Sequence, residues 1–157
     1  MIKKDIHQRF VDQIAAELQS ITASARTSIA TAASGEHRAE SKYDTFKLES
    51  SYLARGMARR VEELSNALES LQMLPLKELH AIQLGALVRL KADDGKIRVL
   101  LFGSAAGGET ITVDGEEIMI VTSRAPLGQA VLGKTVGDAF KIKIGPDTRT
   151  FVVLSVE

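Results

Sequence analysis

The 157-residue chain has no cysteine and no tryptophan, and only 4% of its residues are aromatic. Without cysteine there is no disulfide framework, no thiolate nucleophile and no cysteine-ligated metal site. Basic and acidic residues number 20 each, so the net charge of zero gives no sign of wholesale binding to free nucleic acid or to an anionic membrane. No apolar run approaches the roughly 20 residues of a transmembrane helix, and the first five residues lack the apolar core of a signal peptide. We therefore expect a cytoplasmic protein that does not contact a membrane.

Glycine and proline are scarce in the first half of the chain and concentrated in the second. Only Gly35 and Gly56 precede Pro75, whereas the other ten glycines and all three prolines lie from Pro75 onward. Because both residue types interrupt regular helices, this shift predicts a helical domain over residues 1–75 and a β-rich domain over residues 76–157.

Two stretches of the first half carry apolar or small residues at alternating spacings of three and four, which is typical of a coiled coil. The positions are Val11, Ile14, Leu18, Ile21, Ala25, Ser28 and Ala32, then Ala54, Met57, Val61, Leu64, Leu68 and Leu71. Gly35 is suited to end the first helix and Ser41 to cap the second. We predict an antiparallel hairpin with arms of about 45 Å and a tip near residues 34–42. A monomer is the favoured interpretation, and a four-helix bundle formed by two chains is the alternative.

Charged residues cover the outer faces of the predicted hairpin. Arg59 and Arg60 precede Glu62 and Glu63, and residues three or four apart on a helix are neighbours. We expect ion pairs between these two groups of side chains.

In the second half, apolar and polar residues alternate over short stretches separated by turn residues, which is typical of short strands. The expected strands are residues 86–91, 97–102, 117–122, 140–144 and 150–156, with one short helix over residues 127–132. Asp93 to Lys96 and Gly145 to Asp147 are suited to tight hairpin turns. The fold class is therefore α+β, a helical hairpin followed by an antiparallel sheet with one short helix.

The inserted helix belongs to a motif that runs from Ala125 through Pro-Leu-Gly-Gln-Ala-Val-Leu-Gly-Lys and ends in Gly137 and Asp138. It resembles the signature of the C-terminal domain of the Gre transcript-cleavage factors. The matching residues are Pro126, Gly128, Ala130, Leu132, Gly133, Lys134, Gly137 and Asp138. Arg124 and Ala125 replace an acid and a serine of the family.

The resemblance implies an FKBP-like fold for the second domain and RNA polymerase as the partner. It places the polymerase-binding residues at Arg124, Ala125, Pro126, Leu127 and Gly128. In structural terms alone, Pro126 and Gly128 shape a turn, while Leu127, Val131 and Leu132 bury one face of the helix. A rigid turn of this kind is also suited to display a partner surface.

The tip of the hairpin resembles the family tip between Gly35 and Tyr43. Glu36 falls on the first family acid, Ala39 falls on the second, and Glu40 follows one position later. The resemblance implies that Glu36 and Glu40 assist the polymerase active site by helping to hold its Mg²⁺, a hard cation that prefers oxygen ligands. The chain alone is expected to bind no cofactor and no metal stably. The alternative is that these acids are only solvated tip residues.

Basic residues near the tip have two interpretations. Arg38 and Lys42 are expected to contact phosphates of the nascent RNA 3′ end, and these contacts would be independent of sequence. The alternative is a solvated charged face.

The implied function is that of an elongation factor that inserts its coiled coil into the secondary channel of RNA polymerase and stimulates cleavage of backtracked RNA. The chain would then not be an enzyme, because the polymerase performs the Mg²⁺-dependent cleavage. The alternative is a Gre-like regulator that enters the same channel without cleavage. A prolyl isomerase is disfavoured, because Phe102, Phe140 and Phe151 lie on apolar strands where packing in the core is expected.

Overall fold

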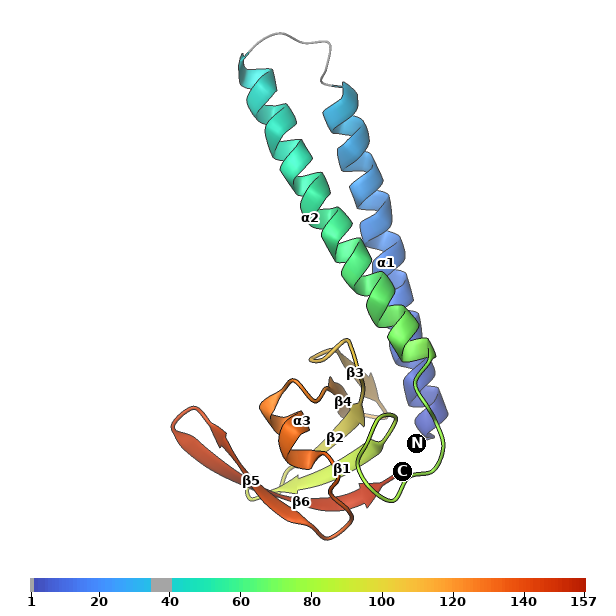
Figure 1. The fold of residues 1–157 in the computed structure, drawn as a ribbon, viewed down its shortest axis with the longest axis vertical. Helices are drawn as coiled ribbons and strands as arrows, with labels where there is room; N and C mark the ends of the chain where they lie inside the picture. The colour runs from blue at the N-terminus through green and yellow to red at the C-terminus, as the bar shows by residue number, and fades with distance from the viewer. Residues whose placement is uncertain (1, 35–40) are drawn as a thin grey trace. The chain divides into compact units, whose positions relative to one another are not determined.

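The computed structural model describes the backbone of residues 2–34 and 41–157 and the side chains of residues 2–27 and 51–157. Helices α1 (Lys3–Ser34) and α2 (Ser41–Gln72) have 32 residues each and form the predicted helical hairpin (Figure 1). Residues 87–156 carry six strands and one short helix. These are β1 (Leu87–Ala92), β2 (Ile97–Phe102), β3 (Thr110–Val113), β4 (Glu116–Val121), α3 (Pro126–Val131), β5 (Ala139–Ile144) and β6 (Asp147–Val156). The predicted architecture is confirmed.

The chain forms two compact units that do not coincide with its helical and β-rich halves. One unit is Asp12–Leu68, and the other joins Met1–Val11 to Glu69–Glu157. The base of both helices therefore belongs to the same unit as the sheet. None of the helices in the described part of the chain is long and apolar enough to cross a membrane.

The unit Asp12–Leu68 is held by the seam that the heptad spacing predicted. Ile14 is fully buried, and Ala25, Ala54 and Leu64 are at most 7% exposed. Glu17 accepts a hydrogen bond from Arg60 of the other helix, with an Nη2–Oε1 distance of 2.7 Å. Because both side chains are about 40% exposed, this ion pair stabilises the unit only modestly, and the apolar seam contributes most.

Of the two acids expected to form ion pairs along α2, Glu63 does so. Arg59 lies 3.5 Å from Glu63, and Arg60 lies 3.7 Å from the same carboxylate. Both pairs are at the spacing of three or four residues that makes side chains neighbours on a helix.

The first turns of α1 are the most polar part of the buried interior. Ile6 and Phe10 are fully buried, and Lys3 and His7 on the same helix are less than 9% exposed. Lys3 Nζ donates to the carbonyl of Lys77, and His7 Nε2 lies 2.6 Å from the carbonyl of Leu71. Since a carbonyl only accepts, His7 carries its proton on Nε2 in this arrangement. Burial lowers the pKa of Lys3, and the nearby carboxylates of Glu157 and Glu78 oppose that shift.

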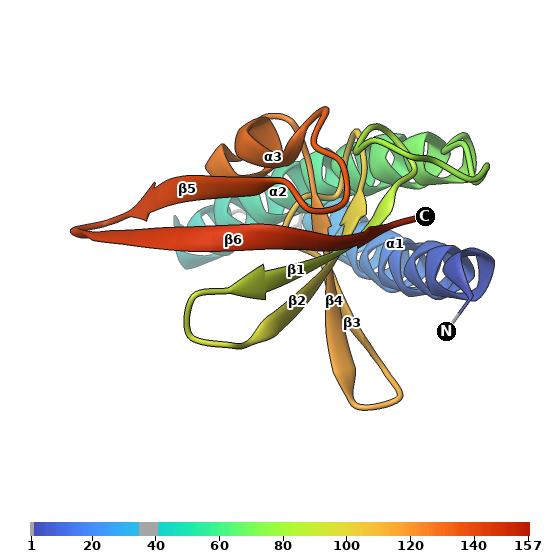
Figure 2. The same cartoon turned by 90° about the horizontal axis from the view of Figure 1, so that it is seen from below.

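The six strands form one sheet in the order β3-β4-β2-β1-β6-β5. Every neighbouring pair is antiparallel except β2 and β4, which are parallel from Val99 opposite Ile118 to Phe102 opposite Val121. The short edge strand β3 is the one that the sequence did not predict, and it accounts for the parallel pair. Because the tight turn at Asp114 and Gly115, both with positive φ, reverses the chain after β3, β4 returns beside β2 in the same direction. The hairpins β1–β2 and β3–β4 point away from each other at their turns (Figure 2).

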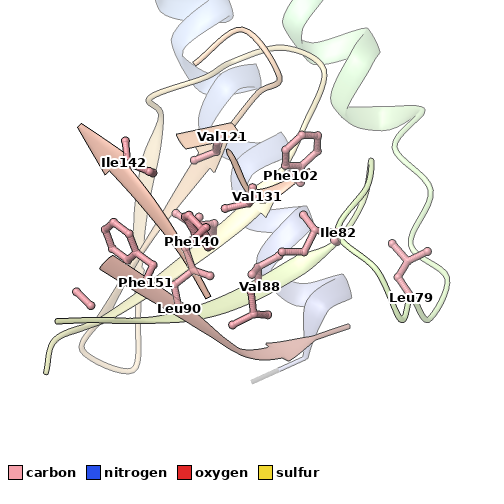
Figure 3. Packing of buried hydrophobic residues seen from close by; sticks show 14 residues of the cluster. Leu79, Ile82, Val88, Leu90, Phe102, Val121, Val131, Phe140, Ile142 and Phe151 are labelled. Atoms are coloured by element: carbon pink, nitrogen blue, oxygen red, sulfur yellow. The ribbon is translucent and has the colours of Figure 1, made fainter. Parts of the chain in front are cut away.

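A core of 14 buried residues fills the face of the sheet that α3 covers (Figure 3). Phe140 and Phe151 stack with their ring centroids 5.6 Å apart. Phe102 belongs to the same cluster, so the prediction that these three phenylalanines pack in the core is confirmed.

Candidate partner-binding site around helix α3

Helix α3 begins one residue earlier than the sequence indicated, with Pro126 in its first turn. A proline is favourable there because the first N–H groups of a helix have no intrahelical acceptor. Ala125 precedes the helix with an extended backbone and makes no side-chain capping hydrogen bond. The serine expected from the family pattern would supply such an acceptor, so the replacement by Ala125 leaves this helix start without it.

Gly128 allows α3 to lie directly against the end of β4. A Cβ atom at this position would lie 1.8 Å from the carbonyl oxygen of Thr122 and 2.6 Å from its carbonyl carbon. Because both are backbone atoms, no side-chain rotation relieves the overlap. The glycine is thus required by close packing rather than by the turn that the sequence suggested.

The buried face of α3 differs from the expected one at one position. Val131 is fully buried and Leu127 is half-buried, but Leu132 is 50% exposed. Leu132 follows the last helical residue and Gly133 adopts φ +79°, so the chain turns away from the core there. The expectation that Leu132 is buried was therefore wrong.

The rest of the motif closes the loop between α3 and β5. Gly133 N–H donates to the carbonyl of Ile82, and Ile82 N–H donates to the carbonyl of Lys134, both at 2.8 Å. The Asp138 carboxylate accepts from the Thr135 backbone N–H at 2.8 Å and from the Thr135 hydroxyl at 3.2 Å. These hydrogen bonds lower the pKa of Asp138 below its usual 3.8, because they favour the ionised carboxylate.

We expect the Asp138 carboxylate to contribute to stability only while it is ionised. A lowered folded-state pKa means that the contribution is present above pH 3.8 and is lost as the pH falls through the folded pKa. The wild-type melting temperature should therefore fall more between pH 5 and pH 3, roughly the window of that titration, than that of Asp138→Asn. Parallel curves for the two proteins would contradict this role. Calorimetry over this pH range is the measurement.

Two surface hollows flank the first turn of α3 and share Ala125 and Leu127. The first has a volume of about 380 Å³ and is lined by Arg98, Ala125, Pro126, Leu127, Ile142, Lys143, Ile144, Gly145 and Phe151. The second has a volume of about 340 Å³ and is lined by Gly107, Gly108, Met119, Ile120, Val121, Thr122, Arg124, Ala125 and Leu127. Of the five predicted polymerase-binding residues, four line a hollow, and the fifth, Gly128, is buried beneath them.

Two residues that were not predicted for this site, Arg98 and Phe151, are brought to the first hollow by the sheet. The guanidinium carbon of Arg98 lies 5.9 Å from the ring centroid of Phe151. One signal for Arg98 was present in the sequence, because it alternates in phase with Leu100 and Phe102 and so falls on the core-facing side of its strand. The proximity of Arg98 to residues 125–127 depends on strand pairing and could not be predicted from the sequence.

The structure does not test the predicted roles of the tip residues. Glu36, Arg38 and Glu40 lie outside the described residues, and Lys42 lies at the start of α2 with a side chain outside the described set. Their roles stay predictions.

The chain thus combines a long helical hairpin with a six-stranded sheet and a short helix flanked by two hollows. Among solved structures it is similar to the transcription factor Gfh1, with 18% identity over 93% of this chain and 92% of that chain and a TM-score of 0.41. It is similar to GreA factor homolog 1 (Gfh1) of Thermus thermophilus, with 17% identity over 94% of each chain and a TM-score of 0.38. It is also similar to the transcription elongation factor GreA/GreB from Nitrosomonas europaea, with 22% identity over 46% of this chain and 56% of that chain and a TM-score of 0.33. No family model and no curated protein matches the chain.

Proposed function

We propose that this chain is a Gre-like elongation factor that binds bacterial RNA polymerase through the surface around α3 and inserts its helical hairpin into the secondary channel. There it stimulates cleavage of backtracked RNA. The observation that carries the proposal is the motif from Ala125 to Asp138. Its matching positions have specific structural roles here: Pro126 starts α3, Gly128 allows close packing, and Asp138 closes the following loop.

The proposed mechanism divides two tasks between the two ends of the protein. The α3 surface supplies affinity, because exposed Arg124 and Pro126 stand beside hollows that a partner can fill. The tip supplies chemistry, with Glu36 and Glu40 adding oxygen ligands near the Mg²⁺ of the polymerase and Arg38 and Lys42 holding RNA phosphates. Two metal ions that stabilise the attacking and leaving oxygens are a general device of phosphodiester cleavage.

The second candidate function is a regulator that occupies the same channel without cleavage. Ala39 at the position of the second family acid favours it, because the methyl group has no oxygen to offer to a metal ion. The experiment that separates the two is a cleavage assay on stalled, backtracked elongation complexes with Mg²⁺. Shortened RNA with a released 3′ fragment supports the cleavage factor. Competition with a cleavage-active Gre factor, without cleavage, supports the regulator, and the absence of both refutes the proposal.

We expect Pro126→Asp to weaken binding to core RNA polymerase by roughly tenfold or more, since a charge replaces an apolar ring at the centre of the proposed interface. The fold should survive, because an acidic residue at a helix N-terminus is favourable. Pro75→Asp is the matched control, since Pro75 is also exposed and lines neither hollow. Fluorescence anisotropy with labelled chains measures both affinities. Unchanged affinity of a Pro126→Asp variant with native melting would remove this residue from the interface.

A further inference from the structure

The first hollow beside α3 combines apolar lining residues with two exposed cations, Arg98 and Lys143. Arg98 projects from the core-facing side of β2, where its guanidinium lies over the ring of Phe151. Arg98 itself is exposed, while Phe151 beneath it is 2% exposed. Ile144, which also lines the hollow, is 53% exposed. The hollow therefore places the accessible apolar side chain of Ile144 in the same lining as a positive charge.

No carboxylate lines either hollow. The lining residues include the cations Arg98 and Lys143 in the first hollow and Arg124 in the second, and the others are uncharged. Within the described part of the chain, Arg98 and Arg124 take part in no ion pair with an acid, whereas Arg89, on the neighbouring strand β1, is bound by both oxygens of Glu116. The α3 surface therefore has unmatched positive charge, and an anionic group of a partner would be attracted to it.

We propose that the α3 surface binds an acidic, apolar protein segment, whose carboxylate pairs with Arg98 and whose apolar side chain fills the hollow between Leu127, Ile144 and Phe151. The inference rests on the proposed function in that the segment would belong to the polymerase. It adds the chemistry of the partner and two residues, Arg98 and Phe151, that lie outside the motif. A protein segment is favoured over nucleic acid because a sugar–phosphate backbone offers no apolar group to these apolar lining residues.

Two labelled helical peptides test the charge preference directly. They share the same apolar residues and length, and they carry either glutamate or lysine at the flanking positions. Fluorescence anisotropy with the full chain should show that the acidic peptide binds about tenfold more tightly or better, as expected for a charge pair at the edge of an apolar contact. Arg98→Glu should reverse this preference. Lys141→Glu changes the net charge equally at an exposed position that lines neither hollow, and it should retain the preference.

Equal binding of both peptides to the wild type would overturn the proposal, and so would an unchanged preference in Arg98→Glu. Arg98→Gln, which keeps a long polar side chain, replaces Arg98→Glu if the latter fails to fold, and it should abolish the preference. Displacement of the acidic peptide by a single-stranded RNA oligonucleotide at equal concentration would instead identify a phosphate site and would also overturn it.

The polymerase-binding measurement separates this inference from the proposed function. A chain that prefers the acidic peptide but does not bind polymerase refutes the proposed function alone. A chain that binds polymerase but shows no preference between the peptides refutes this inference alone.

Discussion

Gly128→Ala is expected to destabilise the unit that contains the sheet by about 2–3 kcal/mol, at the upper end of the usual penalty for overpacking. The added Cβ would overlap the carbonyl oxygen of Thr122, 1.8 Å away, and would also approach Val121 Cγ1 at 3.1 Å. Since the principal obstacle is backbone, α3 must move away from the end of β4. That displacement opens the core around Val131 and distorts both hollows, so partner binding should fall together with stability.

Gly56→Ala provides the matched control for this substitution. Gly56 lies within α2, and beyond its chain neighbours and the adjoining backbone of its own helix, no atom would lie within 4 Å of a Cβ at this position. Alanine in an open helix position is favoured over glycine by roughly 0.5–1 kcal/mol. Thermal and urea unfolding should therefore show opposite signs for the two glycine-to-alanine changes. A Gly128→Ala variant as stable as wild type would mean that α3 does not lie as close to β4 as described.

The double variant Glu36→Ala, Glu40→Ala is expected to reduce transcript cleavage to the rate of the polymerase alone while binding is retained. The reason is chemical, because removal of both carboxylates removes the only oxygen ligands for Mg²⁺ that we propose for the tip. Affinity should not change, since the proposed binding surface is at α3. The cleavage assay with backtracked complexes and the anisotropy measurement report the two properties separately.

Glu62→Ala, Glu63→Ala is the control for the loss of two negative charges from the hairpin. These carboxylates are exposed on α2, and the ion pairs of Glu63 with Arg59 and Arg60 are solvent-accessible, so their removal should change little. Cleavage by this control and none by the tip variant is the expected pattern. Cleavage that survives in the tip variant would exclude the metal-assisting role of Glu36 and Glu40.

The positions of the elements were largely predictable because local patterns carry them. Heptad spacing located the seam, including Ile14 and Leu64, and alternation with turn residues located five of the six strands. β3 was missed because this strand has only four residues, Thr110–Val113, and lies among turn residues. The burial of Ile6 and Phe10 was missed because these residues precede the heptad pattern and belong to the unit that contains the sheet.

The sequence by itself determined the order of a helical hairpin and a β-rich domain, the aromatic core positions, and the motif around α3. Periodicity and turn chemistry depend on residues close together in the chain, so they can be recognised from the sequence alone. The tertiary structure alone decided the parallel pairing of β2 with β4, the need for glycine at position 128, and the meeting of Arg98 and Phe151 with α3. Each of these depends on which distant backbone lies alongside, and that choice is set by packing of the whole domain rather than by local preference.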